Sequence, residues 1–413
     1  MTPVIYLREQ ELKELLQGGD GRQNITEGSA SGWDNATVFH AYVKPPSAPL
    51  AGAAAGCSFI ISSSETFADL ENHVAQLSLQ QYASGAKLLV LIAAGKDTIS
   101  VKAFVKNEQS VSEGEVKLIP EKSELYSRSK GLLETDALAK KKVGIVGLGS
   151  GGAPIAVELA KAGVGRLVLI DFDRIEISNV ARHVCGLNDL GRYKTLAVRD
   201  LLLQKNPYAE VTTLEMDVTQ QRSACAEALS AVDLMVVASD NDHSRFLMNE
   251  TALRYKIPAI FGRAITRAIG GDVMRVRPYE GPCYSCLYSQ NIRGGGSDDE
   301  EISRTEQAKK LLPEYTSESE LQAAIQVGLA SDIAPISNFM VKLALVELSR
   351  GIESGIKSLE EDLVSDFYIW ANRRENVYEN WSRLEYNFNK PSILRWYGAK
   401  VSRDPNCMVC GDF

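Results

Sequence analysis

The sequence predicts an α/β protein whose central sheet is doubly wound and mostly parallel. Strand-like and helix-like segments alternate from about residue 123 to about residue 290, which is typical of a parallel sheet with helices on both faces. The first strand runs into the glycine-rich turn Val-Gly-Ile-Val-Gly-Leu-Gly-Ser-Gly-Gly at 143–152, and a helix pattern follows at once. This order of strand, glycine turn and helix is that of a Rossmann-like nucleotide-binding unit.

The individual elements follow from short apolar runs and the amphipathic segments between them. Strands are predicted at 142–146, 166–171, 210–214, 234–238 and 259–262. Helices are predicted at 153–162, 194–205, 220–230 and 244–255. A further apolar helix is predicted at 336–349, and we expect the aromatic-rich last sixty or so residues to add antiparallel strands.

Residues 1–122 have a composition of their own, and we expect a small, separate α+β domain there. Helices are predicted at 10–16 and near 67–82, with strands at 37–43, 58–62, 87–92 and 98–105. The domain partly resembles a metallo-isopeptidase sheet, but its histidines, His40 and His73, are far apart in sequence. An accessory or binding role is therefore expected rather than catalysis, and residues 123–413 form the second domain.

The composition excludes several classes of protein. The chain has 413 residues, of which 45% are hydrophobic and 24% charged, as in an ordinary soluble protein of two or three domains. Its net charge of −8 argues against nucleic-acid binding. No apolar run reaches the roughly 20 residues of a membrane span, and the N-terminus lacks a signal-peptide core. We therefore expect a cytoplasmic protein.

Four of the seven cysteines form two Cys-x-x-Cys pairs, Cys283 with Cys286 and Cys407 with Cys410. Four thiolates predict a closed, tetrahedral and structural zinc site that anchors the C-terminal tail. Two redox-active dithiols are the alternative.

The glycine turn predicts a phosphate site. Gly147 allows the tight turn, Gly149 lets the backbone approach a phosphate, and Gly152 allows close packing of helix on strand. Asp171 lies about twenty residues further on, where a carboxylate can bind ribose hydroxyls.

The residues after Asp171 favour nucleotidyl transfer over hydride transfer. Two cations, Arg182 and Lys194, suit the charge that develops at an α-phosphate. Asp240 follows the fourth strand and suits Mg²⁺. A nicotinamide dehydrogenase has no evident use for these groups.

At this point six motifs occur in order. They are "YSR" at 126–128, "GIVGLGSGG" at 144–152, "DFDRIEISNVAR" at 171–182, "DLGRYK" at 189–194, "SDN" at 239–241 and "GPCYSC" at 281–286. Residues 126 to about 351 thereby resemble the ThiF/MoeB/HesA family, the ubiquitin-activating-enzyme-like adenylyltransferases.

The resemblance implies a role for each matching residue. Asp171 would bind the ribose, with Asp173 supporting the site, and Asp240 would hold Mg²⁺. The ATP phosphates would be contacted by Asn179, Arg182, Lys194 and the loop glycines Gly147, Gly149, Gly151 and Gly152. Arg128 would reach into the ATP site of a neighbouring subunit, which implies a homodimer.

The implied activity is ATP-dependent adenylation of the C-terminal glycine carboxylate of a ubiquitin-like or sulfur-carrier protein, with release of pyrophosphate. The N-terminal domain suggests a bacterial ubiquitin-like conjugation system, in which a conjugating enzyme is a possible partner. A peptide-adenylating enzyme of a modified-peptide pathway and a non-catalytic nucleotide-binding scaffold remain as alternatives.

The sequence departs from the family in the crossover loop, enlarged here to about 287–330. Many members carry an acyl-accepting cysteine there, but residues 287–350 contain none. The acyl group then passes directly to another nucleophile, or forms an ester on Thr316, Ser317 or Ser319, or moves to Cys185. The first two routes are favoured equally, and the third least.

Overall fold

The computed structural model describes residues 4–8, 28–33, 36–41, 57–62, 88–94, 99–106, 111–119, 122–265, 268–293, 328–373 and 393–412. The chain divides into two compact units, Met1–Arg128 and Ser129–Phe413. Among the helices described, none combines the length and apolarity needed to cross a membrane.

The first unit contains a seven-stranded sheet in the order β2-β3-β1-β7-β6-β5-β4. Its strands are β1 (Val4–Arg8), β2 (Gly28–Trp33), β3 (Ala36–Ala41), β4 (Cys57–Ser62), β5 (Leu88–Ala94), β6 (Ile99–Lys106) and β7 (Val111–Ile119). The four predicted strands correspond to β3, β4, β5 and β6. β1, β2 and β7 were not predicted, because β2 is rich in glycine and serine and β7 is largely polar. The helices predicted at 10–16 and 67–82 lie outside the described residues.

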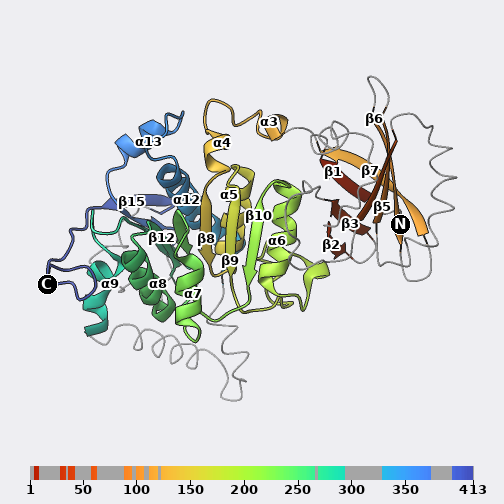
Figure 1. Cartoon of the computed structure of the whole chain (residues 1–413). Helices are drawn as coiled ribbons and strands as arrows, with labels where there is room; N and C mark the ends of the chain where they lie inside the picture. Colours follow the sequence, from red (N-terminus) through yellow and green to blue (C-terminus); the bar gives the residue numbers. More distant parts are fainter. Residues whose placement is uncertain are drawn as a thin grey trace, which may run out of the picture. The chain divides into compact units, whose positions relative to one another are not determined.

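The second unit is built on an eight-stranded sheet in the order β10-β9-β8-β11-β12-β13-β14-β15 (Figure 1). The strands are β8 (Lys142–Val146), β9 (Arg166–Ile170), β10 (Glu210–Leu214), β11 (Leu234–Val237), β12 (Ala259–Ala264), β13 (Gly270–Val276), β14 (Phe367–Ala371) and β15 (Arg395–Ala399). The first five in this order are parallel, and β13, β14 and β15 pair antiparallel. The predicted doubly wound sheet with an antiparallel C-terminal extension is confirmed.

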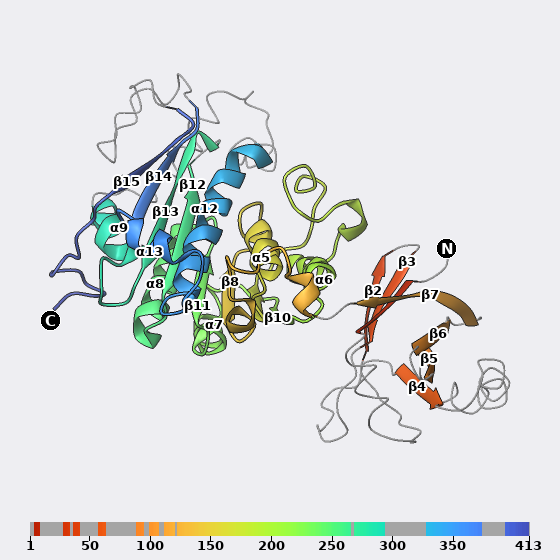
Figure 2. The ribbon, with the colours of Figure 1, turned by 90° about the horizontal axis from the view of Figure 1, so that it is seen from above.

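Helices cover both faces of this sheet (Figure 2). One face carries α5 (Gly152–Lys161), α6 (Lys194–Lys205) and α12 (Ala330–Leu348), and the other carries α7 (Arg222–Leu229), α8 (Asp242–Tyr255) and α9 (Tyr284–Arg293). The strands alternate between the two cores: Val143 and Ile145 belong to the first, whereas Val146 belongs to the second. Both faces of each central strand are buried, which explains their continuous apolar sequences.

Two helices depart from the predicted pattern. α12 begins at Ala330, six residues before the predicted start at Ile336, and continues through Pro335. Proline usually marks a helix start, so the sequence pattern placed the boundary too late. α9 extends to Arg293, into the predicted crossover loop. Four short helices complete the described elements: α3 (Lys122–Leu125), α4 (Thr135–Leu138), η2 (Leu187–Asp189) and α13 (Lys357–Asp362).

Candidate nucleotide site and cysteine cluster

Two loops that carry predicted nucleotide-site residues lie where the sheet reverses its winding direction. From β8 the chain moves outward to β9 and β10, then returns to β11 on the other side of β8. The carboxyl ends of β8 and β11 therefore border a topological switch point, which is where open α/β sheets bind ligands. The loop after β8 holds residues 147–151, and the loop after β11 holds residues 238–241.

These two loops touch, and glycine is needed at the contact. Gly147 has a φ of +85°, and a Cβ there would lie 2.8 Å from the Ser239 nitrogen. A Cβ on Gly152 would lie 1.8 Å from the Gly147 carbonyl oxygen. By contrast, a Cβ on Gly149 would meet no described atom within 4 Å, and one on Gly151 would only contact Ser337 Oγ at 3.7 Å. The fold thus requires glycine at positions 147 and 152, whereas Gly149 faces open space.

The N-terminus of α5 is open to an anion. Its N-cap is Gly151, no described side chain caps it, and its first turn has no acidic residue. The first backbone N–H groups of a helix have no partner within the helix and favour negative charge.

Both backbone polar groups of Leu148 are hydrogen-bonded to side chains. Its N–H donates to Asp171 Oδ2 at 2.7 Å, and its carbonyl accepts from His183 Nε2 at 2.7 Å. The other oxygen of Asp171 accepts from the Asp173 N–H at 2.8 Å. Burial raises the pKa of Asp171. Each carboxylate oxygen has two lone pairs, so Asp171 anchors the loop and keeps acceptor capacity for ribose hydroxyls.

His183 is not among the residues predicted from the sequence. Its Nδ1 accepts the Cys185 N–H at 3.1 Å, so Nε2 carries the proton that is donated to Leu148. Burial lowers the pKa of His183, which favours this neutral form. The available signal was its place directly after Arg182 in the motif, in a chain with four histidines.

Lys194 begins α6 and pairs with Asp173. The Nζ to Oδ2 distance is 2.6 Å, and the Lys194 N–H also donates to the Asp173 carbonyl at 3.0 Å. The lysine side chain is 10% exposed and the aspartate 49%. The ammonium has three donors, so Lys194 can contact a phosphate while Asp173 holds it in place.

The remaining predicted residues differ in their surroundings. Asn179 Oδ1 accepts the Glu176 N–H at 3.0 Å, and the Asn179 carbonyl accepts the Arg182 N–H at 2.9 Å. Arg182 is half-buried, whereas Asp240 is exposed directly beyond β11. Arg128 is exposed in the turn after α3 and belongs to the first unit.

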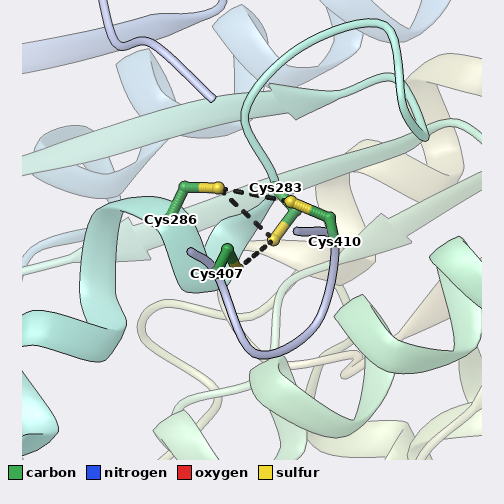
Figure 3. A group of neighbouring side chains, drawn as sticks. All are labelled: Cys283, Cys286, Cys407 and Cys410. Atoms are coloured by element: carbon green, nitrogen blue, oxygen red, sulfur yellow. Dashed lines mark hydrogen bonds between the residues drawn. The ribbon is translucent and has the colours of Figure 1, made fainter. Parts of the chain in front are cut away.

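The four paired cysteines come together as predicted (Figure 3). Their sulfurs all lie within 4.8 Å of one another, with separations of 3.7 Å for Cys283–Cys407, 3.8 Å for Cys283–Cys286 and 3.4 Å for Cys286–Cys410. Four sulfurs at 2.3 Å from zinc are about 3.8 Å apart. All four residues are buried, so the cluster suits a closed structural zinc site.

The model of the ThiF family matches residues 123–372, which is more than half of the chain. The chain belongs to the ThiF family.

Several curated relatives match part of this ThiF-family chain. A sulfur carrier protein adenylyltransferase of Thermus thermophilus is 35% identical over 158 residues, and the sulfur carrier protein ThiS adenylyltransferase of Escherichia coli is 34% identical over 156. The adenylyltransferase and sulfurtransferase MOCS3 of Aedes aegypti is 32% identical over 152. Each match covers 37% of this chain but 57%, 61% and 34% of the respective relatives, so the chain spans less than two thirds of their length.

Among solved structures, Escherichia coli MccB with ATP has a TM-score of 0.47 at 20% identity, covering 67% of this chain and 68% of that one.

The structure describes only some of the candidate acyl acceptors of this ThiF-family chain. Thr316, Ser317 and Ser319 lie outside the described residues. Cys185 is buried, and burial raises the pKa of its thiol to about 12. Because the thiolate is the nucleophile, Cys185 is poorly suited to acyl transfer. Cys225 lies on α7 and is buried in the core, as expected for an apolar cysteine.

Proposed function

We propose that this ThiF-family protein uses ATP to adenylate the C-terminal carboxylate of a small carrier protein. The observation that carries the proposal is the contact of two loops at the switch point. Gly147 meets Ser239 there, and the open N-terminus of α5 begins directly beyond the first loop. Asp171, Lys194 and Asp240 flank the same edge of the sheet. This set of groups suits a nucleotide with a metal-bound phosphate chain.

In this proposal each group has one task. Asp171 binds the ribose hydroxyls and keeps the Leu148 peptide in place. The phosphates are contacted by Asn179, Arg182, Lys194 and the N–H groups of the glycine loop. Asp240 would hold Mg²⁺, which neutralises phosphate charge when bound.

The reaction is a substitution at the α-phosphorus. A carboxylate oxygen of the carrier attacks that phosphorus, the bond to the bridging oxygen of the β-phosphate breaks, and pyrophosphate leaves. Arg182 and Lys194 stabilise the charge that develops on the phosphoryl oxygens. The product is a mixed anhydride between the carrier and AMP.

The proposed substrate is a ubiquitin-like or sulfur-carrier protein that ends in glycine. Two relatives of this chain are named as adenylyltransferases of sulfur carrier proteins, and a glycine tail has no side chain to obstruct access to the nucleotide. We propose a cytoplasmic setting, where the four clustered thiols stay reduced for zinc.

The fate of the acyl group is the finer part of the proposal. Residues 287–350 contain no cysteine, and the Cys185 thiol is buried with a raised pKa. We therefore propose direct transfer to an external nucleophile or an ester on Thr316, Ser317 or Ser319. Mass spectrometry of the enzyme with carrier and ATP separates these routes. An ester gives an adduct that survives thiols and is cleaved by hydroxylamine, whereas direct transfer gives no adduct.

We also propose a homodimer in which Arg128 serves the partner's site. Five apolar side chains between β9 and α6 support a protein partner on this segment. Their exposed fractions are 56% for Phe172, 69% for Ile177, 37% for Val184, 63% for Leu187 and 43% for Leu190.

ATP–pyrophosphate exchange tests the activity. Labelled pyrophosphate should enter ATP only when a sulfur-carrier protein with a free C-terminal glycine is present. The same carrier with an amidated C-terminus is the control, because it lacks the attacking carboxylate. Asp240→Ala should reduce exchange by roughly 100-fold or more. Exchange without any carrier, or undiminished exchange by Asp240→Ala, would contradict the proposal.

A further inference from the structure

A buried arginine on α8 holds the loop that carries Asp240. Arg245 is 5% exposed. One guanidinium nitrogen donates to the Ser239 carbonyl at 2.6 Å, and another donates to Asp242 Oδ1 at 2.7 Å. Ser239 directly precedes Asp240, so Arg245 fixes the peptide from which the exposed carboxylate extends.

The first turn of α8 holds the same loop at further points. Asn241 caps the helix by accepting the Ser244 N–H at 2.8 Å. The Ser244 hydroxyl lies 2.5 Å from Ser239 Oγ and 2.9 Å from the Asn241 carbonyl oxygen. Residues 239 and 241 are therefore both tied to α8, and only the residue between them is left to project outward.

The contacts continue from Arg245 to the cysteine cluster. The Tyr284 hydroxyl, between Cys283 and Cys286 in sequence, donates to Asp242 Oδ1 at 3.3 Å. Asn249 lies one turn beyond Arg245 on the same side of α8. It accepts the Tyr284 N–H at 3.0 Å and donates to Cys283 Sγ at 3.5 Å.

Packing alone does not explain an arginine at this position. Its Nε has no hydrogen-bond partner in the part of the chain that the structure describes. A buried guanidinium with one unsatisfied nitrogen is less favourable than an apolar side chain of similar size. The hydrogen bonds that Arg245 makes to the Ser239 carbonyl in the loop and to Asp242 at the start of α8 explain its presence better than packing does.

We infer that Arg245 is a positioning residue that aims Asp240 at nucleotide-bound Mg²⁺, and that Tyr284 and Asn249 brace it against the cysteine cluster. The inference rests on the proposed function of the site as an ATP site. Arg245 itself contacts neither substrate nor metal.

The test compares two Arg→Lys variants. In Arg245→Lys a single ammonium replaces the planar fork, so it cannot hold Ser239 and Asp242 in the same geometry. Arg277→Lys is the matched control. Arg277 is 15% exposed and pairs with Glu347 and Glu360. Arg277 directly follows β13. The last residue of β13 pairs with the first residue of β12, so Arg277 lies at the edge of the sheet opposite the nucleotide site.

The measurement is calorimetric titration of ATP into the full-length protein, with EDTA or with a series of Mg²⁺ concentrations. With EDTA, both variants should bind ATP as the wild type does. Adding Mg²⁺ should increase the ATP affinity of the wild type and of Arg277→Lys. In Arg245→Lys this increase should be about 10- to 100-fold smaller, as for other residues that orient a metal ligand. Tyr284→Phe, which removes only a hydroxyl, should reduce the gain several-fold.

A double-mutant cycle separates positioning from a general structural effect. In an Asp240→Ala background the Mg²⁺-dependent gain should be lost, and adding Arg245→Lys should change nothing further, because both changes act through one carboxylate. A full Mg²⁺ gain in Arg245→Lys, or an additive loss in the double variant, overturns the inference. Absence of ATP binding by the wild type in both conditions would instead refute the proposed function.

Discussion

Asp171 and His183 hold the backbone on the two sides of Leu148 in the glycine loop, one at its N–H and the other at its carbonyl. The loop geometry depends on a neutral histidine, because Nδ1 must accept the Cys185 N–H while Nε2 donates to Leu148. Burial lowers the pKa of His183, with a smaller effect from Lys194 in the same direction, while the hydrogen bond to Leu148 and the charges of Asp171 and Asp189 oppose them. Protonation would place a second donor opposite the Cys185 N–H and weaken the loop.

His183 therefore makes stability depend on pH. Its pKa in the folded state lies below the unfolded value of 6.5, so the unfolded chain binds the extra proton as the pH falls. Its contribution is fully present above pH 6.5 and is lost as the pH falls to the folded pKa, by up to about 1.4 kcal/mol per pH unit.

His183→Gln should remove this part of the pH dependence, because glutamine can donate to Leu148 but does not titrate. Urea unfolding of both proteins between pH 8 and pH 5 measures the difference. Parallel curves over the whole range would show that His183 does not titrate as described.

The loop glycines allow fold and binding to be separated. Gly152→Ala would place Cβ 1.8 Å from the Gly147 carbonyl oxygen, so we expect a loss of about 2 kcal/mol or more in the free energy of unfolding. Gly149→Ala meets no described atom within 4 Å, so stability should be kept while ATP binding weakens.

Gly151→Ala is the matched stability control for both glycine variants, because its Cβ would come no nearer than 3.7 Å to a described atom. Urea unfolding should give it a stability close to that of the wild type. Equal destabilisation of all three variants would contradict the steric account.

At the level of elements, a buried ionic network joins the end of β13 to α12 and α13. Arg275 contacts Glu347 at 3.7 Å, Glu360 at 2.9 Å and Asp366 at 2.6 Å, and Arg277 contacts Glu347 at 2.8 Å. Glu347 is 3% exposed at its side chain. Burial alone would lower the pKa of Arg277, but hydrogen bonds to Glu347 and Glu360 outweigh it and raise the pKa above its usual value.

Glu347→Leu should lower the free energy of unfolding by about 3 kcal/mol, because it leaves two arginines with one buried partner fewer. Since the network lies at the edge of the sheet opposite the nucleotide site, the ATP affinity of the folded variant should not change. Urea unfolding and ATP titration measure the two effects, and a parallel loss of affinity would contradict this separation.

The elements differ in how well the sequence predicts them. β8, β9 and α6 follow from apolar runs and helical periodicity, and α6 matches its predicted range. β13 was missed because it contains two glycines and two charged residues, Asp272 and Arg275, that are nevertheless buried. Partners on other elements make that burial possible, such as Arg263 on the neighbouring strand for Asp272 and Asp366 for Arg275.

The candidate site shows the same division. The loop glycines and the four cysteines are adjacent to turns and follow known spacings, so they can be found in the sequence. The pairing of Lys194 with Asp173 and the roles of His183 and Arg245 depend on contacts between loops, which no local pattern encodes.

At the scale of the whole molecule, the proposed homodimer predicts complementation between two inactive variants. If Arg128 acts on the partner's site, a mixed dimer of Arg128→Ala and Asp240→Ala has one site with both residues intact. Mixing the two variants should then restore up to about a quarter of wild-type pyrophosphate exchange, because half the dimers are mixed and half their sites are complete.

Each variant alone serves as the control for this experiment. If Arg128 acted within its own chain, no mixed site would contain both residues. Exchange that stays at the level of the separate variants after subunit exchange would therefore contradict the shared site.

The central claim is that a carrier carboxylate attacks the α-phosphate of ATP at the switch point between β8 and β11. It is tested most directly with a carrier whose C-terminal carboxylate is labelled with ¹⁸O, in the presence of hydroxylamine to capture the acyl group. Capture breaks the acyl–oxygen bond, so the account predicts AMP that contains ¹⁸O and unlabelled pyrophosphate. Formation of ADP with labelled inorganic phosphate, or release of unlabelled AMP, would contradict it.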